Sequence, residues 1–457
     1  MDIRPTSPPT DKSLDTLIPD LASQYKVPGA AAGLLVGDRK AIAVAGITNT
    51  RTQTPVTLDT VFQIGSITKV LTSVLALQLV DDGLLDLDAP LRKYLPQLQL
   101  GDRRAADVVT MRQLLCHTCG LQGDYYADFG WGPDTVQRYV ESLNGVDQVH
   151  PPGERFSYSN PGYVLAGRVI EVLRGATWND ALAARVLAPA SLAHSGTRPE
   201  EALLHSAAIG HVPAPDGALH PAPVWAIFPS QAPAGATAFC SAGDLLGIGA
   251  ILLGSGKAMN GAFLVSPKSC DVMLAPQVAV PTHAYAEAQW GVGVSIEKWG
   301  GTTVVGHDGG TPTGQVAALR LVPDRQVVAC VMANSLTSAQ FVLEALDEML
   351  AEHAKVTRPE VPAPLPPGDR PDAAQFVGVY RRLGSELEVT AGPNHTLQLV
   401  ERAADGIRTH ILEPVSARTY RYTNLFGMPD LAVFDGADEG PPDYLLLSRA
   451  HRRVSQP

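Results

Sequence analysis

One stretch restricts the fold of this chain more than any other. Ser66-Ile67-Thr68-Lys69 leads into an apolar run, Val70 to Leu79, that predicts a helix beginning near Ser66. Residues three apart on a helix lie on one face, with Cβ atoms about 5–6 Å apart, so Ser66 and Lys69 can act together as nucleophile and base. A helix N-terminus also disfavours the ammonium form of lysine and offers backbone N–H groups to an oxyanion.

The Ser-x-x-Lys spacing is a weak signal when it stands alone. Ser23-Gln24-Tyr25-Lys26 has the same spacing, and we expect this serine to be buried inside a helix and without function. The interpretation of Ser66 therefore depends on partners further along the chain.

The composition describes a globular protein. With 457 residues, 45% of them hydrophobic, the chain can bury a large core in two or three domains. A formal charge of −11 argues against nucleic acids and anionic membranes as partners. The first residues lack an apolar signal core, and no stretch approaches the roughly 18 apolar residues of a membrane span, so we expect a soluble cytoplasmic protein.

The five cysteines favour a reducing compartment, because an odd number thinly spread over a long chain does not suit a disulfide framework. Cys116-His117-Thr118-Cys119 has redox spacing, but its surroundings do not resemble a thioredoxin βαβ unit. We interpret these two cysteines as small packed thiols.

The order of predicted elements indicates an α+β fold. A hairpin over residues 30–45 precedes the Ser66 helix, and strands over 302–305, 316–321 and 327–332 precede a closing helix over 341–353. Residues 357–372 contain six prolines and read as a linker. The predicted division is a catalytic domain over 1–356, this linker, and a domain over 373–457.

The last domain shows the period of two that is typical of strands. Leu387 and Val389, Leu397 and Leu399, and Thr409 and Ile411 alternate with other residues between turn signals. This pattern predicts a small all-β domain, a barrel.

Two long loops rich in aromatic residues interrupt the catalytic domain. Long ordered loops often bind ligands, although covering the edge of a core is an equal alternative. The candidate substrate-binding residues in them are Tyr125, Tyr126, Trp131, Trp225 and Phe228.

Three motifs follow one another along the chain: Ser66-x-x-Lys69, Tyr158-x-Asn160 and His307-Asp308-Gly309. Their order resembles the serine β-lactamase and penicillin-binding-protein superfamily, in particular the class C β-lactamase-like branch that includes esterases and D-amino-acid peptidases. The resemblance covers roughly residues 14–355, and the last domain resembles the lipocalin-like barrel that some members carry.

The resemblance implies a role for each motif residue. Ser66 is expected to be the acylated nucleophile and Lys69 its base, sharing that task with Tyr158 as phenolate or proton relay. Asn160 is expected to hold Lys69 or a substrate amide. The backbone N–H groups of Ser66 and Gly310 are expected to form the oxyanion hole.

Two departures from the superfamily bear on the substrate. His307 takes the place of the usual lysine and exchanges a permanent cation for a group that titrates near neutrality. Asp308 places a carboxylate where penicillin-recognising members use a hydroxyl, beside Gly309, which with Gly310 lets the strand approach Ser66. Both changes should weaken the binding of a substrate carboxylate, so we expect poor β-lactamase and D,D-carboxypeptidase activity.

Three functions fit these motifs. The first is hydrolysis of an ester or peptide amide, and the second is acyl transfer, because the chain also resembles the penicillin-binding-protein-type thioesterases that cyclise nonribosomal peptides. The third is a non-catalytic ligand-binding sensor. No cofactor or metal is implied, since nucleotide-binding loops and closely spaced histidines are missing from the sequence. The oligomeric state is open.

Overall fold

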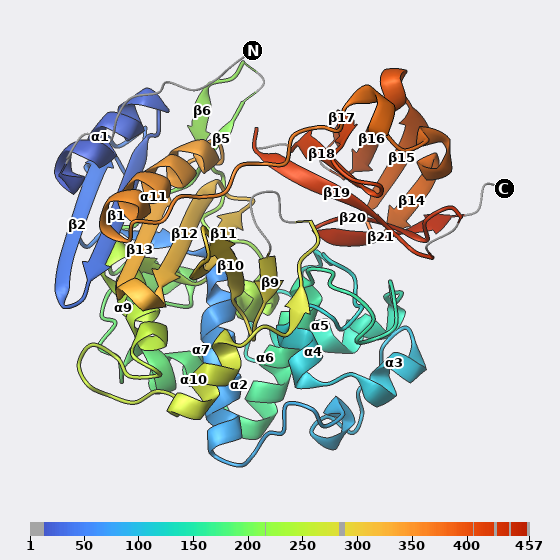
Figure 1. Cartoon of the computed structure of the whole chain (residues 1–457). Coiled ribbons are helices and arrows are strands. Elements are labelled where there is room, and N and C mark those ends of the chain that lie inside the picture. The colour runs from blue at the N-terminus through green and yellow to red at the C-terminus, as the bar shows by residue number, and fades with distance from the viewer. Residues whose placement is uncertain are drawn as a thin grey trace.

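The computed structural model describes residues 13–454 except 215, 283–287, 405, 425–426 and 438–439. Figure 1 shows a body of sheet and helices, coloured blue to orange, with a red β-barrel beside it. The fold class is α+β, as the sequence predicts.

One antiparallel sheet of eight strands runs through the body in the order β2-β1-β13-β12-β11-β10-β9-β8. The predicted hairpin forms β1 and β2, and the predicted later strands form β11, β12 and β13. The strand bounds are β1 Gly29–Val36, β2 Arg39–Gly46, β8 Val278–Ala279, β9 Ala288–Trp290, β10 Ser295–Trp299, β11 Thr302–Thr311, β12 Gln315–Val322 and β13 Val327–Ala333.

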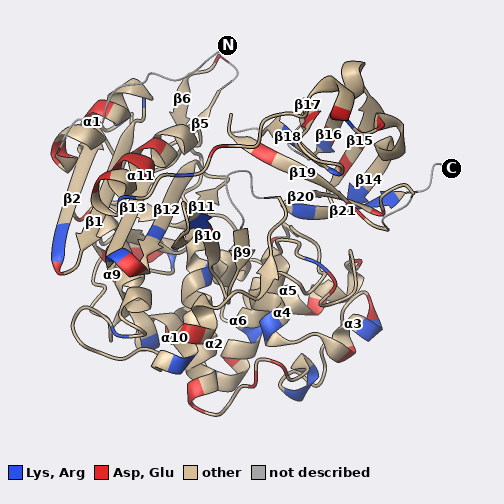
Figure 2. Cartoon of the chain, in the orientation of Figure 1, with Lys and Arg blue, Asp and Glu red and all other residues tan. Residues whose placement is uncertain are grey.

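Helices cover both faces of this sheet, which explains why β12 and β13 are almost continuously apolar. α1 (Leu14–Gln24) and α11 (Ala339–His353) pack on one face, and α9 (Ala242–Leu253) packs on the other. Acidic side chains lie along α1 and α11 (Figure 2). The helix α1 continues through Pro19, and Ser23 is exposed. The expectation that Ser23 is buried was therefore wrong.

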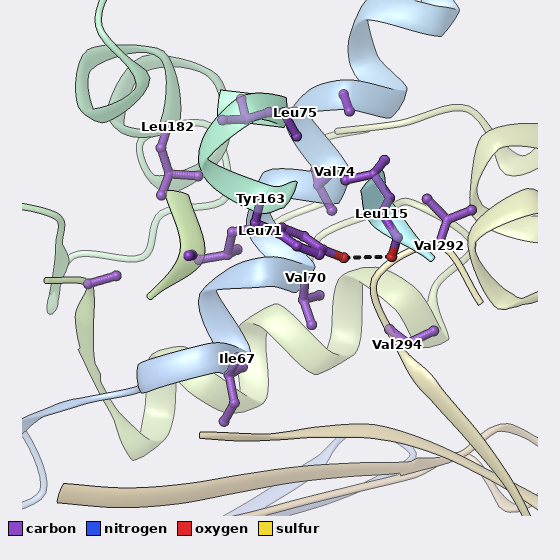
Figure 3. Packing of buried hydrophobic residues seen from close by; sticks show 14 of the residues in the cluster. Ile67, Val70, Leu71, Val74, Leu75, Leu115, Tyr163, Leu182, Val292 and Val294 are labelled. Carbon is purple, nitrogen blue, oxygen red and sulfur yellow. Dashed lines mark hydrogen bonds between the residues drawn. The ribbon is translucent and has the colours of Figure 1, made fainter. Parts of the chain in front are cut away.

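The helices α6 (Asn160–Arg174), α7 (Trp178–Leu182) and α10 (Pro267–Leu274) pack around α2 (Thr68–Asp81), which is buried from Thr68 to Leu77. Tyr163 from α6 (Asn160–Arg174) packs beside α2, and its hydroxyl donates to the carbonyl of Leu115 at 2.8 Å (Figure 3). Because neighbours surround α2 on nearly all sides, the start of the helix is held rigidly. The other helices are α3 Arg103–Val108, α4 Met111–Leu115, α5 Thr135–Ser142 and α8 Pro199–Ala202; the short strands are β3 Val61–Gln63, β4 Ser195–Gly196, β5 His211–Pro213, β6 Leu219–Pro221 and β7 Phe239–Ser241.

The C-terminal strands close into a barrel of eight antiparallel strands. Their bounds are β14 Gly378–Arg382, β15 Ser385–Ala391, β16 Leu397–Ala403, β17 Gly406–Pro414, β18 Thr419–Thr423, β19 Pro429–Asp435, β20 Tyr444–Leu447 and β21 Arg449–Val454. In β15 and β16 the predicted alternation is right, since Leu387 and Leu399 are among the fully buried residues. In β17 the inward residue is Leu412, whereas Ile411 is 56% exposed, so the predicted alternation there was off by one.

Between α11 and β14 the described chain forms no strand, only two short 3-10 turns, Pro367–Asp369 and Ala373–Phe376. Cys116 and Cys119 are free and buried, as expected of packed thiols. No helix among the described residues is long and apolar enough to cross a bilayer.

Candidate active site

Ser66 and Lys69 meet at the start of α2. Ser66 lies in the 3-10 turn Gly65–Ile67, and Lys69 Nζ is 3.0 Å from Ser66 Oγ. Lys69 Nζ also donates to the carbonyl of Ala234 at 2.6 Å. Burial lowers the pKa of Lys69 well below its ordinary value, and the guanidinium of Arg449 adds to this effect. Both effects favour the deprotonated amine, which faces the serine hydroxyl.

The turn that carries Ser66 lies against β11. A Cβ on Gly309 would stand 1.9 Å from the carbonyl oxygen of Ile64, and a Cβ on Gly65, whose φ is +49°, would stand 2.7 Å from the backbone N of Gly310. Only glycine permits this approach. A Cβ on Gly310 would meet nothing within 4 Å. We had expected both glycines to be needed for the close contact, but among these two only Gly309 is.

Ser66 and Gly310 line one pocket of about 50 Å³. This places the two residues predicted to form an oxyanion hole at the same small space. The pocket is also lined by Tyr126, Asn160, Ile227, Gln231, Ala234, Gly235, Ala236, Thr311 and Pro312.

Tyr158 lies in the irregular segment just before α6. Lys69 Nζ is 5.0 Å from the centre of its ring. Burial raises the pKa of Tyr158 above its ordinary value, although a hydrogen bond with Ser66 opposes that rise. Tyr158 is therefore a neutral phenol at neutral pH, which fits the relay role and leaves the phenolate alternative without support.

His307 lies on β11 with its imidazole buried. Its ring centre is 5.2 Å from that of Trp290 and 6.3 Å from that of Tyr158. Nδ1 donates to the carbonyl of Asp308 at 2.6 Å, so Nε2 carries a lone pair, and among the described residues it has no hydrogen-bond partner. Burial lowers the pKa of His307 to about 3. The expectation that this group titrates near neutrality was wrong.

Asp308 points to the opposite face of the sheet, because successive residues of a strand alternate. Its carboxylate accepts two hydrogen bonds from Arg320, at 2.6 and 3.1 Å. The structure does not bring Asp308 to the Ser66 pocket. Of the two reasons for expecting weak binding of a substrate carboxylate, only the neutral His307 therefore remains.

Asn160 Nδ2 donates to Asp124 Oδ1 at 2.8 Å. The two hydrogen bonds of the Lys69 amine described above go to Ser66 and Ala234, so Asn160 does not hold Lys69 through either of them. Asp124 also pairs with Arg449 at 2.8 Å and with Arg382 at 3.5 Å, both from the barrel. Burial alone would raise the pKa of Asp124, but the two guanidinium groups and the Asn160 amide lower it below its ordinary value.

Sequence analysis missed Asp124 and Arg449. The guanidinium carbon of Arg449 is 5.2 Å from the centre of the Tyr158 ring. The hairpin between β20 and β21 holds it there, since the carbonyl of Ser448 accepts from Tyr158 N and Ala450 N donates to Ser157 Oγ, both at 3.0 Å. No spacing rule links positions 124 and 449, so the sequence carried no signal for this pair.

The five aromatic candidates separate into two groups. Tyr126 lines the pocket. The others lie elsewhere: Tyr125 packs on Tyr139, Trp131 is 68% exposed, Trp225 donates to the carbonyl of Ala208 and packs on Phe239, and Phe228 precedes the 3-10 turn Pro229–Ala234. Within the described ranges, no three His, Cys, Asp or Glu side chains gather as metal ligands would.

Comparison with known proteins agrees with this geometry. The Beta-lactamase family model matches residues 14–354. Penicillin-binding protein 4 of Amycolatopsis lactamdurans is 38% identical over 368 residues, which cover 80% of this chain and 96% of that protein.

Solved structures extend the likeness to the barrel. The structure of SurE aligns with this chain at a TM-score of 0.76 and 28% identity, over 96% of this chain and 97% of the SurE chain. SurE has also been solved with D-Leu. A D-stereospecific amidohydrolase from Streptomyces sp. has a TM-score of 0.59 and 26% identity over 72% of this chain and 96% of its own. The chain therefore belongs to the Beta-lactamase family, within the superfamily of β-lactamase-type and penicillin-binding-protein-type serine hydrolases.

Proposed function

We propose that this chain cleaves an ester or peptide amide through an acyl-enzyme on Ser66. The observation that carries the proposal is the buried amine of Lys69, which lies 3.0 Å from Ser66 Oγ and whose pKa is lowered by that burial. This is the arrangement that activates a serine as a nucleophile.

In the proposed reaction, Ser66 Oγ attacks the substrate carbonyl carbon while Lys69 Nζ accepts its proton. The backbone N–H groups of Ser66 and Gly310 stabilise the oxyanion. The Tyr158 phenol passes the proton to the leaving alcohol or amine as the carbon–leaving-group bond breaks. Water then attacks the ester on Ser66, and the same groups return its proton to the serine.

The relatives favour a D-configured residue on the acyl side of the scissile bond. SurE binds D-Leu, and the Streptomyces relative is D-stereospecific. Paired ester substrates that differ only in the configuration of this residue test the preference: we expect faster turnover of the D form, and equal rates would contradict it.

A chromogenic acyl ester tests the nucleophile itself. The Ser66→Ala variant should lose about 10³-fold or more of the turnover, as expected when a catalytic nucleophile is removed. Ser23→Ala is a matched control, because Ser23 has the same spacing to a lysine but is exposed on α1. Equal turnover by Ser66→Ala and the unaltered protein would refute the proposal.

Penicillin should be a poor substrate. The lysine expected at position 307 is replaced by an imidazole that is neutral at physiological pH, and Arg449 is already paired with Asp124. Rapid penicillin turnover with a low KM would contradict this expectation.

A second candidate function is acyl transfer, in which an amine resolves the acyl-enzyme. The barrel hairpin is hydrogen-bonded to the segment that carries Tyr158, and a cover that excludes water favours attack by an amine over attack by water. A peptidyl thioester followed by mass measurement separates the two functions: hydrolysis gives the linear acid, and cyclisation gives a product lighter by one water.

A further inference from the structure

His117 forms hydrogen bonds with the backbone on both sides of Tyr158 and packs on the Tyr158 ring. Its carbonyl accepts from Ser157 N at 2.8 Å, and its Nδ1 accepts from Ser159 N at 3.0 Å. Its ring centre lies 4.0 Å from that of Tyr158 at an interplanar angle of 31°. One residue thus holds both neighbours of Tyr158 and one side of its ring.

These contacts matter because Tyr158 belongs to no helix or strand. Without ladder hydrogen bonds of its own, the segment takes its place from its neighbours. The barrel hairpin supplies the remaining backbone contact, from Tyr158 N to the carbonyl of Ser448.

The backbone of His117 gives independent support. His117 follows α4 with a φ of +58°, a left-handed conformation that glycine or asparagine adopts at lower cost. A residue strained in this way is common at functional sites, where its surroundings hold it in place. A position that needed only to end the helix would be better filled by glycine.

His117 is fully buried, and its hydrogen bonds within the described part of the chain go to no residue that lines the pocket. Because Nδ1 accepts the Ser159 N–H, the proton of the neutral imidazole is on Nε2. Burial lowers the pKa of His117 well below its ordinary value, and Lys69 and His307 add to this effect. The imidazole therefore stays neutral, and its Nδ1 remains a hydrogen-bond acceptor.

We propose that His117 is a positioning residue that fixes the Tyr158 phenol beside Ser66 and Lys69. This inference rests on the proposed function of Ser66. His117 acts through Tyr158 and does not contact the reacting atoms.

Two substitutions separate its contacts. His117→Phe keeps an aromatic ring but removes the acceptor for Ser159 N, whereas His117→Asn keeps an acceptor and tolerates the left-handed backbone but removes the ring. We expect kcat to fall about 10- to 100-fold in His117→Phe, since a misplacement of about 1 Å can cost that much, and less in His117→Asn. KM should stay within about twofold.

The decisive measurement is a double-mutant cycle with Tyr158→Phe. If His117 acts through the phenol, the His117 substitutions should cost little further activity once that phenol is absent. Equal losses in both backgrounds would overturn the proposal. His211→Phe is a matched control, because His211 is also fully buried and also accepts a backbone N–H, from Thr50; it should lower the melting temperature without the loss of kcat.

Labelling of Ser66 by a fluorophosphonate supplies a readout that needs no natural substrate. Its rate should fall in the His117 variants as kcat does, and an unchanged rate would overturn the proposal. If His117→Phe does not fold, His117→Asn carries the same cycle. Failure of Ser66→Ala to reduce turnover would instead refute the function itself, so the two failures are distinguishable.

Discussion

Two neighbouring regions differ in the charge of their buried polar groups: the surroundings of Ser66, called here the Ser66 side, and the contact between the barrel and the body, called the barrel side. On the Ser66 side, burial favours the uncharged forms of Lys69, Tyr158 and His307. On the barrel side, Asp124 and Arg449 stay ionised, because each has a partner of opposite charge.

The difference follows from pairing. A buried charge without a partner is neutralised by a shift in pKa, whereas a buried charge with a hydrogen-bonded counter-ion persists. The neutral side can exchange protons, and the charged side fixes the barrel against the body. The two regions are linked by Arg449, whose guanidinium also helps to lower the pKa of Lys69.

The largest effect should come from the neutral side. Lys69→Met removes the base but keeps an apolar side chain of similar length, so turnover should fall about 10³-fold while the melting temperature stays equal or rises, since a buried amine is costly. Lys298→Met is the control, because Lys298 is exposed on β10 and its amine donates a hydrogen bond to Thr303. Retained turnover in Lys69→Met would remove the lysine from the mechanism.

On the charged side, Asp124→Asn should destabilise the protein by about 3–5 kcal/mol, because Arg449 and Arg382 lose their counter-ion while they remain buried. Denaturant titration measures the change. Glu386→Gln breaks an exposed pair with Arg381 and should cost at most about 1 kcal/mol. Similar costs for the two variants would mean that the barrel is not held by charge.

Buried neutral histidines lie on both sides. Burial lowers the pKa of His451 in the barrel, like that of His307, to about 3. The unfolded chain binds protons below the ordinary pKa of 6.5 and the folded chain only below about 3, so stability is lost as pH falls between these values. Each histidine should contribute a loss of roughly 2 kcal/mol by pH 5.

His451→Gln should flatten this dependence, as measured by denaturant titration at pH 7 and pH 5. His353→Gln, at the end of α11, is the control and should retain the full slope. A slope unchanged by His451→Gln would show that the barrel histidine is not the group that titrates.

The smallest effect on activity should come from Asp308. Its carboxylate is bonded to Arg320 on the face of the sheet away from Ser66, so Asp308→Asn should leave KM within about twofold. The melting temperature should fall, because the buried guanidinium of Arg320 loses a counter-ion. A large change in KM would return Asp308 to the substrate site.

The sequence predicted what depends on local pattern. The apolar run after Ser66 became α2, the alternating residues of β15 and β16 became barrel walls, and the three ordered motifs came together at one cleft. Each of these has a signal within a few residues or in a motif.

What the sequence did not predict depends on distance or on burial. The pair of Asp124 and Arg449 joins a loop of the body to a hairpin of the barrel, and only the packing of one on the other creates it. The charge state of His307 depends on how deeply β11 is covered. The side to which Asp308 points depends on the strand beginning at Thr302 and running through the motif, which we had placed beyond the strand end.

The most direct test of the account is the site of acylation. After reaction with a fluorophosphonate, peptide mapping should find one modification for each chain, on Ser66, and none at that site in Ser66→Ala or Lys69→Met. Modification of another serine, or equal labelling of Lys69→Met, would contradict the account.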